Sequence, residues 1–214
     1  LALTARRLDR LDALAADMAA QHAIETITIS ADLADAGAAD AILAAIAARG
    51  RAVDVLVNNA GYGLPGDWLE SAWADQARTI QVMLTAPLEL SHKVLPGMAE
   101  RRWGRILNIA SLAGFGPGNP GAATYAAVKA ALIKFSQALN VEMAGTGVHC
   151  TAVCPGLTHS EFHADGRLRA QTHQHEFLPG AGNQLHDIDH EHRPAFEGVA
   201  QILHFAPERF AARQ

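Results

Sequence analysis

Short apolar runs alternate with amphipathic segments along most of the chain, and this alternation constrains the fold more than any other feature. The apolar runs occupy residues 1–4, 24–30, 53–57, 105–110 and 147–153, and apolar residues recur at helical spacing between them. Strands joined by helices of this length need crossover connections, which make the strands parallel and cover both faces of the sheet. The sequence therefore predicts an α/β fold, a doubly wound parallel sheet in a single domain over residues 1–214.

Three further segments follow from the same reading. A long amphipathic helix is predicted over residues 73–98 and a last helix over residues 196–205. Residues 159–193 are polar, show no period and contain seven of the eleven histidines. Imidazole and carboxylate groups are metal-ligand types, but their spacing here matches no closed site. We expect a solvated loop, with metal binding or a pH response as the alternative. The residues concerned are His173, His175, His186, Asp187, Asp189, His190 and His192.

Composition and charge exclude several classes of function. The net charge is -5 and the lysines and arginines are scattered, so no basic surface for nucleic acid is expected. No apolar run approaches the roughly 18 residues of a membrane-spanning helix, and no secretory leader begins the chain. We therefore expect a cytoplasmic protein that binds neither nucleic acid nor membrane. Cys150 and Cys154 lie four apart where a strand runs into a turn, which predicts core thiols and no disulfide.

Polar residues follow the apolar runs, at the edge of a parallel sheet where ligands bind. Arg6 and Arg7 follow the first run and suit either the 2'-phosphate of NADP or a solvated helix start. Asp32 follows the second run, where an unaccompanied aspartate is expected to cap the next helix, with an adenine amino group as the alternative partner. The asparagines and glycines of residues 58–63 suit either a flat ligand or a plain turn.

A hydroxyl, a phenol and an amine are predicted to meet at this edge. Ser111 follows the fourth run, and a loop rich in glycine and proline leads from it to Tyr125. Tyr125 and Lys129 are four residues apart at the start of a predicted helix, so they share one helix face. A surface tyrosine–lysine pair is the alternative for such a short pattern taken alone.

The ordered set of motifs resembles the classical short-chain dehydrogenase/reductase family. The set comprises N-N-A-G at residues 58–61, Ser111, Y-x-x-x-K from Tyr125 to Lys129, and P-G with a nearby threonine at residues 155–158. The resemblance covers residues 1–162. It implies a Rossmann-like fold, hydride transfer between a nicotinamide cofactor and a small carbonyl or alcohol, and a substrate lid over residues 159–193. It also implies a homodimer or homotetramer paired through the helix over residues 73–98 and the Tyr125 helix.

The resemblance also implies a role for each motif residue. Tyr125 would be the general acid and base, Lys129 its electrostatic partner, and Ser111 the group that holds the substrate oxygen. The Lys129 ammonium and a nicotinamide charge are expected to lower the pKa of Tyr125. Arg6 and Arg7 favour NADP over NAD, because no acidic residue stands at that strand end. The expected cofactor-binding residues are Arg6, Arg7, Asp32, Leu33, Asn59, Ala60, Gly61, Tyr125, Lys129, Pro155, Gly156 and Thr158.

Two departures from the family pattern leave a second function open. The glycine-rich loop written TGxxxGxG is absent from the sequence, so the chain is expected to lack the first βα unit of the family. Many members carry an asparagine where this chain has Met83, and a thioether cannot replace an amide. Either Gln81 or backbone carbonyls would then serve instead, or the proton relay would be impaired. The alternative function is therefore a catalytically silent relative that acts only as a folded binding protein.

Overall fold

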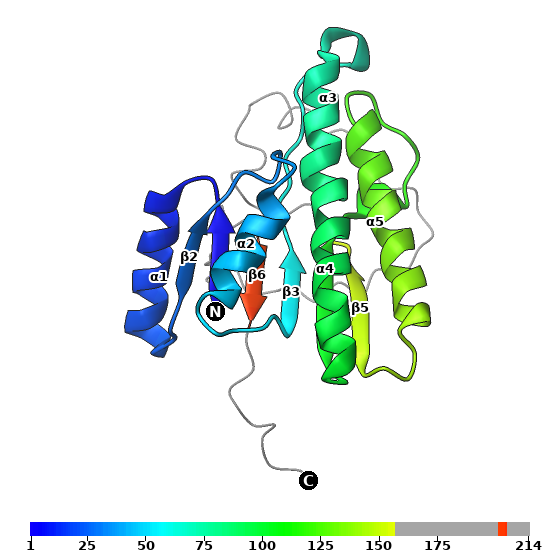
Figure 1. Ribbon diagram of the computed structural model, residues 1–214. Helices are drawn as coiled ribbons and strands as arrows, with labels where there is room; N and C mark the ends of the chain where they lie inside the picture. Colours follow the sequence, from blue (N-terminus) through cyan, green and yellow to red (C-terminus); the bar gives the residue numbers. More distant parts are fainter. Residues whose placement is uncertain (157–200, 205–214) are drawn as a thin grey trace.

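A computed structural model describes residues 1–156 and 201–204 of the chain (Figure 1). The secondary structure alternates as the apolar pattern predicts. The strands are β1 (Ala2–Ala5), β2 (Ile27–Ser30), β3 (Val55–Asn58), β4 (Gly104–Ile109), β5 (Val148–Val153) and β6 (Gln201–His204). The α-helices are α1 (Leu8–His22), α2 (Ala38–Ala47), α3 (Trp73–Ile80), α4 (Ala86–Glu100) and α5 (Ala123–Glu142).

The strands form one sheet in the order β2-β1-β6-β3-β4-β5. The pairs β1–β2, β3–β4 and β4–β5 are parallel, as predicted for crossover connections. β6 lies between β1 and β3 and runs antiparallel to both, as Figure 1 shows by its reversed arrow. The sheet is therefore mixed at its centre, and the prediction of a wholly parallel sheet is wrong at this one position.

The last predicted helix is also wrong. Residues 196–205 were expected to be helical, but Gln201–His204 form β6. A short apolar run fits a buried strand as well as a helix, because four residues are too few to establish a period. Pairing on both sides decides between the two, since β6 completes the backbone hydrogen bonds of β1 and β3.

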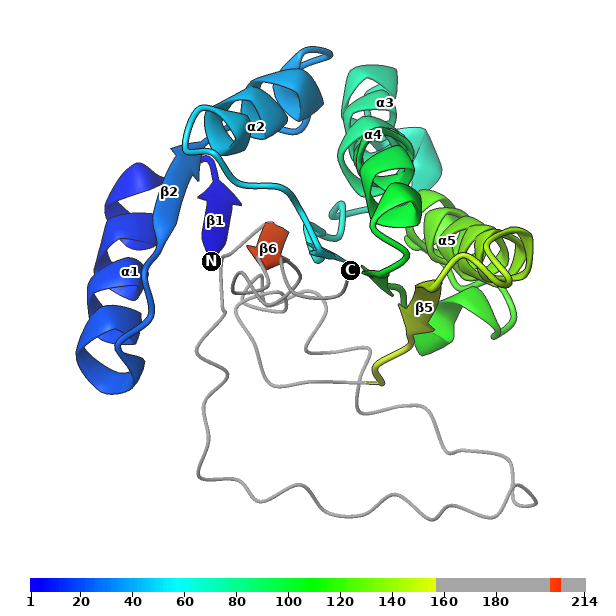
Figure 2. The same ribbon diagram turned by 60° about the horizontal axis from the view of Figure 1, so that its bottom comes forward.

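Helices cover both faces of the sheet, which confirms the doubly wound architecture. Alternate residues of β1 point to opposite faces: Ala2 joins the main core, whereas Leu3 packs with Leu11 and Met18 of α1. Helices α2, α4 and α5 lie on the other face from α1, as Figure 2 shows. Each of the strands β1 to β5 thus contributes an apolar side chain to the main core.

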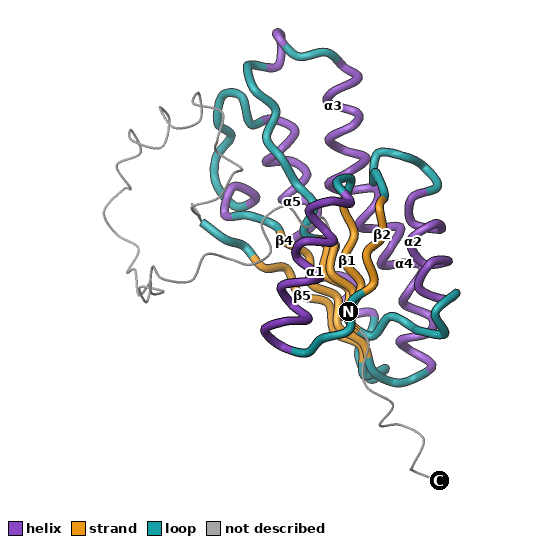
Figure 3. Tube along the Cα trace, turned by 90° about the vertical axis from the view of Figure 1, so that its left-hand side faces the viewer, coloured by secondary structure: helices purple, strands orange, loops and turns teal. Residues whose placement is uncertain are grey.

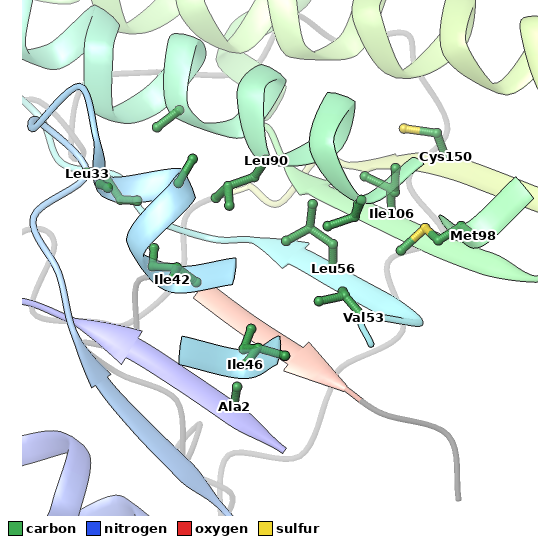
Figure 4. Packing of buried hydrophobic residues seen from close by; sticks show 14 of the residues in the cluster. Ala2, Leu33, Ile42, Ile46, Val53, Leu56, Leu90, Met98, Ile106 and Cys150 are labelled. Atoms are coloured by element: carbon green, nitrogen blue, oxygen red, sulfur yellow. The ribbon is translucent and has the colours of Figure 1, made fainter. Parts of the chain in front are cut away.

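The main core lies between the sheet and α2, α4 and α5. Leu56 of β3 and Ile106 of β4 are fully buried there, together with Ile42 of α2 and Leu90 and Met98 of α4 (Figure 4). Burial of each such side chain contributes about 1.5–3 kcal/mol. This packing fixes the helices relative to β3 and β4, whose carboxyl ends carry the predicted site.

The long helix predicted over residues 73–98 is confirmed, with a change of pitch inside it. α3 and α4 are joined by a π-helical turn over Gln81–Thr85, in which the N–H of Ala86 donates to the carbonyl of Gln81. Such turns recur at functional sites. α3 extends past the carboxyl ends of the parallel strands, as Figure 3 shows. Among the described residues, no helix has the length and apolar character needed to cross a membrane.

We predict that Ile202→Pro strongly destabilises the protein. Ile202 lies in register with Leu3 of β1 and Val57 of β3, so proline would remove a ladder hydrogen bond at the centre of the sheet. The loss is expected to be about 3 kcal/mol in the free energy of unfolding, measured by urea denaturation. A denaturation midpoint equal to that of the natural protein would contradict the placement of β6.

Candidate active site

A buried hydrogen-bond network ties the ends of β3 and β4 to α5. Asn58 Nδ2 donates to Asn108 Oδ1 at 2.7 Å, and Asn108 Nδ2 donates to Ser136 Oγ at 2.8 Å. All three side chains are at most 3% exposed. Because a buried amide must find partners, this network fixes the two strands and the helix in one arrangement. Sequence reasoning missed Asn108 and Ser136, although an asparagine inside an apolar strand was a visible signal.

The structure brings Ser111 and Tyr125 together, as their positions in the sequence predict. Ser111 follows β4 and begins a 3-10 turn over Leu112–Gly114, where its Oγ accepts a hydrogen bond from the N–H of Ala113 at 3.2 Å. Tyr125 lies in the first turn of α5 and is half-buried. The two side chains are hydrogen-bonded to each other. A serine hydroxyl and a phenol thus face one point at the carboxyl edge of the sheet.

Lys129 lies one turn further along α5 and is 4% exposed. Its Nζ donates to the carbonyl oxygen of Ile109 at 2.6 Å and lies 5.6 Å from the centre of the Tyr125 ring. The acceptor is thus a backbone carbonyl, one of the two alternatives expected in place of an asparagine, and not Gln81. Burial lowers the pKa of Lys129 from 10.5 to about 8, and the nearby Cys154 thiol acts in the opposite sense.

The predicted lowering of the Tyr125 pKa is not found in the protein alone. Burial raises the pKa of Tyr125, and the hydrogen bond with Ser111 offsets part of this rise. The Lys129 ammonium lies over the aromatic ring and makes its hydrogen bond to Ile109, so it does not act as the direct partner of the phenol. Desolvation therefore outweighs charge in the protein alone, and the lowering expected from Lys129 together with a nicotinamide charge stays a prediction for the cofactor-bound state.

A hollow of about 370 Å³ lies at the carboxyl ends of β1 and β2. Arg6, Ser30, Asp32 and Gly37 are among the residues that line it, and Ser30 Oγ donates to the carbonyl of Arg6 at 3.2 Å. The Arg6 guanidinium and the Ser30 hydroxyl suit a phosphorylated ribose, and the Asp32 carboxylate suits an adenine amino group. The hollow is therefore compatible with the adenosine end of a dinucleotide.

Asp32 does not cap the next helix, because the residue before α2 is Gly37. Its Oδ1 accepts from the N–H of Ala34 at 3.0 Å, and its Oδ2 forms an ion pair with Arg78. Burial raises the pKa of Asp32, but the hydrogen bond from Ala34 and the ion pair with Arg78 outweigh it, so the pKa lies below its ordinary value. Asp32 is therefore held as a carboxylate that faces the hollow.

The remaining predicted contacts lie in different places. Arg7 is exposed at the start of α1 and does not line the hollow, whereas Leu33 is 3% exposed inside the main core. The Leu33 side chain therefore cannot reach an adenine, and only its backbone stays a predicted contact. Thr158 and the histidine-rich segment 159–193 lie outside the described residues. Among the described residues, no cluster of histidine, cysteine or acidic side chains could bind a metal ion.

Two backbone segments lie beside the catalytic candidates. Asn59, Ala60 and Gly61 leave the end of β3, and a β-carbon added to Gly61 would lie 3.6 Å from Lys129 Nζ. The carbonyl of Pro155 accepts from the N–H of Leu112 at 3.1 Å, which ties residues 155–156 to the turn after Ser111. Both segments thus approach the trio from neighbouring strands, where the sequence predicted the cofactor to lie.

A nicotinamide dinucleotide fits the two ends of this edge. The adenosine end would lie at Arg6 and Asp32, and the reacting end at Ser111, Tyr125 and Lys129. Between β1 and β3 the described residues place the beginning of β6, whose Gln201 is in register with Thr4 and Asn58. At this central position the described residues contain no helix N-terminus, the element that favours phosphate binding.

Gln76 and Thr124 were not predicted, yet they brace the start of α5. Both are buried, and the Thr124 hydroxyl donates to the Gln76 Oε1 in a short hydrogen bond. Gln76 Nε2 in turn donates to Ser71 Oγ at 2.7 Å. The bond links α3 to the residue that precedes Tyr125. No sequence signal pointed to it, because the two partners are 48 residues apart.

Comparison with known proteins agrees with this geometry. The family described as short chain dehydrogenase matches residues 1–170. The chain belongs to the short-chain dehydrogenase family. The resemblance drawn from the motifs is therefore confirmed, together with the Rossmann-like fold.

Curated relatives include enzymes with different substrates. The sulfoacetaldehyde reductase of Chromohalobacter salexigens is 35% identical over 164 residues, 76% of this chain and 64% of the relative. The ketoacyl reductase HetN of a Nostoc species is 43% identical over 104 residues, 49% of this chain and 36% of the relative. This member of the short-chain dehydrogenase family thus spans only 36% and 64% of the length of these two relatives.

Solved structures of the family share the fold and differ in cofactor. A short-chain dehydrogenase from Sphingobium yanoikuyae, in complex with NADPH, has a TM-score of 0.69 and 34% identity over 77% of this chain and 64% of that one. A 3-oxoacyl-(acyl-carrier protein) reductase from Brucella melitensis, with bound NAD, has a TM-score of 0.66 and 29% identity over 72% and 60%. Family members with this architecture therefore bind nicotinamide cofactors of both kinds.

We predict that Lys129→Met, which removes the buried ammonium, makes the protein more stable at neutral pH. A folded-state pKa of about 8 against 10.5 means that burial disfavours the ammonium. After the lost hydrogen bond to Ile109 is subtracted, the gain is expected to be roughly 1–3 kcal/mol in the free energy of unfolding.

The difference in the free energy of unfolding between Lys129→Met and the natural protein should depend on pH. Below pH 8 the folded natural protein carries the full penalty, and between about pH 8 and 10.5 the penalty fades, because only the unfolded chain still binds the proton. The difference between variant and natural protein should therefore shrink across that window in urea denaturation. A variant that is less stable than the natural protein at pH 7 would contradict the account of Lys129.

Proposed function

We propose that the protein is an NADP-dependent oxidoreductase that interconverts a small carbonyl compound and its alcohol. One observation carries the proposal: the hydrogen-bonded pair of Ser111 and Tyr125 lies one helical turn from the buried Lys129 amine. Surface tyrosine–lysine pairs do not share a buried site with a serine from another element. The arrangement has the acid, the cation and the hydroxyl that carbonyl reduction requires.

Each residue of the trio has a distinct task in this proposal. When bound, the nicotinamide cofactor supplies or accepts the hydride. In the direction of reduction, Tyr125 gives its phenolic proton to the carbonyl oxygen, and its raised pKa means that this proton is present at neutral pH. Ser111 donates a hydrogen bond to the same oxygen as negative charge develops on it. Lys129 supplies positive charge one turn away, which favours the phenolate that the transfer leaves behind.

The hollow at β1 and β2 supports NADP over NAD. Arg6 lines it with a guanidinium, which binds a 2'-phosphate through paired hydrogen bonds. The carboxylate on its wall, Asp32, is already paired with Arg78, so it does not present free negative charge to a phosphate. We also propose that the protein is cytoplasmic and assembles as a homodimer or homotetramer through the long helix over residues 73–98 and α5.

A catalytically silent binding protein is the second function to test. Met83 at the position of the usual asparagine and β6 at the centre of the cofactor edge favour it. The two functions differ in cofactor binding, which is measured without any substrate. A rise in nicotinamide fluorescence on mixing protein with NADPH supports the enzyme, whereas no rise with NADPH or NADH supports the silent relative.

We predict that Tyr125→Phe lowers kcat/KM for carbonyl reduction by about 10²- to 10⁴-fold, because the proton donor is removed. Fluorescence titration of the same variant should still detect NADPH binding, which shows that the loss of activity is not a loss of the fold. The assay follows NADPH consumption with a panel of small aldehydes and ketones. Undiminished kcat/KM in the variant would overturn the assignment of Tyr125, and tighter binding of NADH than of NADPH would overturn the cofactor preference.

A further inference from the structure

Met83 and Lys129 approach the same point of the chain from two different helices. Met83 lies in the middle of the π-helical turn over Gln81–Thr85 and is fully buried. A β-carbon added to Gly61 would lie 3.5 Å from Met83 Cε and 3.6 Å from Lys129 Nζ. The thioether methyl group and the ammonium group therefore border the same small space after β3, and the backbone carbonyl oxygen of Asn59 lies 3.8 Å from the same point.

The other groups around Lys129 offer it a single strong acceptor among the described residues. On α5 itself the neighbour is the Tyr125 ring, with its centre 5.6 Å from Nζ. At the end of β4 the Ile109 carbonyl accepts at 2.6 Å, and at the end of β5 the Cys154 thiol acts on Lys129 electrostatically. From the π-helical turn comes only the thioether of Met83, which is a weak acceptor. Within the described residues, no carboxylate contributes to the shift of the Lys129 pKa.

We propose that Met83 is a positioning residue for Lys129: it shields the ammonium from water on the side of the π-helical turn and leaves the Ile109 carbonyl as the one hydrogen-bond acceptor of the ammonium among the described residues. The proposal rests on the proposed function, in which Lys129 is the cation beside Tyr125. An amide at position 83 would instead present an oxygen and room for water. The natural side chain thus keeps this part of the site dry.

The dry surroundings have a chemical consequence for the reaction. Because burial destabilises the charged form, the pKa of Lys129 is about 8, so the ammonium loses its proton at a lower pH than an exposed lysine does. Met83 therefore sets the alkaline limit of the pH range in which the cation is present. An amide oxygen at the same place would stabilise the ammonium and extend that range upward.

Lysine titration by nuclear magnetic resonance tests the proposal without any substrate. The chain has only three lysines, Lys93, Lys129 and Lys134, so carbon-13 labelling of lysine Cε gives three signals that single Lys→Arg variants assign. Met83→Asn should raise the Lys129 midpoint by about one pH unit, since a hydrogen bond to a charged group has that magnitude. Met83→Leu is the matched control, because it keeps an apolar side chain of similar volume.

The expected result is a Lys129 midpoint that rises in Met83→Asn, stays in Met83→Leu, and leaves Lys93 and Lys134 unmoved in both. A Lys129 midpoint that is the same in all three proteins overturns the role of Met83. If thermal denaturation shows that Met83→Asn does not fold, Met83→Gln, which is closer to methionine in shape, is measured by the same criterion.

Activity separates this proposal from the proposed function. In an active enzyme the alkaline limb of kcat/KM against pH should move upward in Met83→Asn, together with the Lys129 midpoint. Carbonyl reduction with an unmoved midpoint means that the role of Met83 is wrong and the enzyme assignment stands. A moved midpoint in a protein that binds no nicotinamide cofactor supports the contact with Met83 and rejects the enzyme.

Discussion

The Lys129 ammonium lies inside the protein, where its hydrogen bond to the Ile109 carbonyl must offset the loss of water around a charge. That carbonyl has to be in a fixed place, and the amide network of Asn58, Asn108 and Ser136 keeps β4 and α5 in register around it. The same network also positions Ser111 and Tyr125. Ser111 follows Asn108 closely in the chain, and Tyr125 is on the same helix as Ser136. The buried Lys129 ammonium therefore lowers the free energy of unfolding, and in the proposed reaction it supplies the positive charge beside Tyr125.

The sheet brings these groups together by topology. The parallel strands end at one edge, so residues after β1, β2, β3, β4 and β5 meet there although they are far apart in the sequence. The hollow at β1 and β2 lies at one end of this edge, and Ser111, Tyr125 and Lys129 lie at the other, with β6 between them. β6 therefore joins the half of the sheet that contains β1 and β2 to the half that contains β3, β4 and β5. Because β6 is antiparallel to both of its neighbours, the sheet differs at this strand from one built by crossover connections alone.

Local patterns predicted much of this structure. Five strands and the long helix follow from apolar periodicity, and the meeting of Ser111 with Tyr125 follows from strand order and loop length. β6 was beyond such reasoning, because the four residues Gln201–His204 become a strand only through their two neighbours. The raised pKa of Tyr125 and the placement of Met83 beside Gly61 depend on packing in three dimensions, which motif spacing does not contain.

The surroundings of Tyr125 set the pKa of its phenol. In the protein alone, burial raises this pKa. Beside a bound oxidised cofactor, we expect the positive charge of the nicotinamide ring to lower it. The chain has two tyrosines, and the Tyr62 hydroxyl is buried without a hydrogen-bond partner among the described residues, so Tyr62→Phe leaves a single phenol to observe. Ultraviolet titration of that variant should show Tyr125 ionising above its ordinary pKa alone and at lower pH with oxidised NADP. The same midpoint in both states would contradict the account.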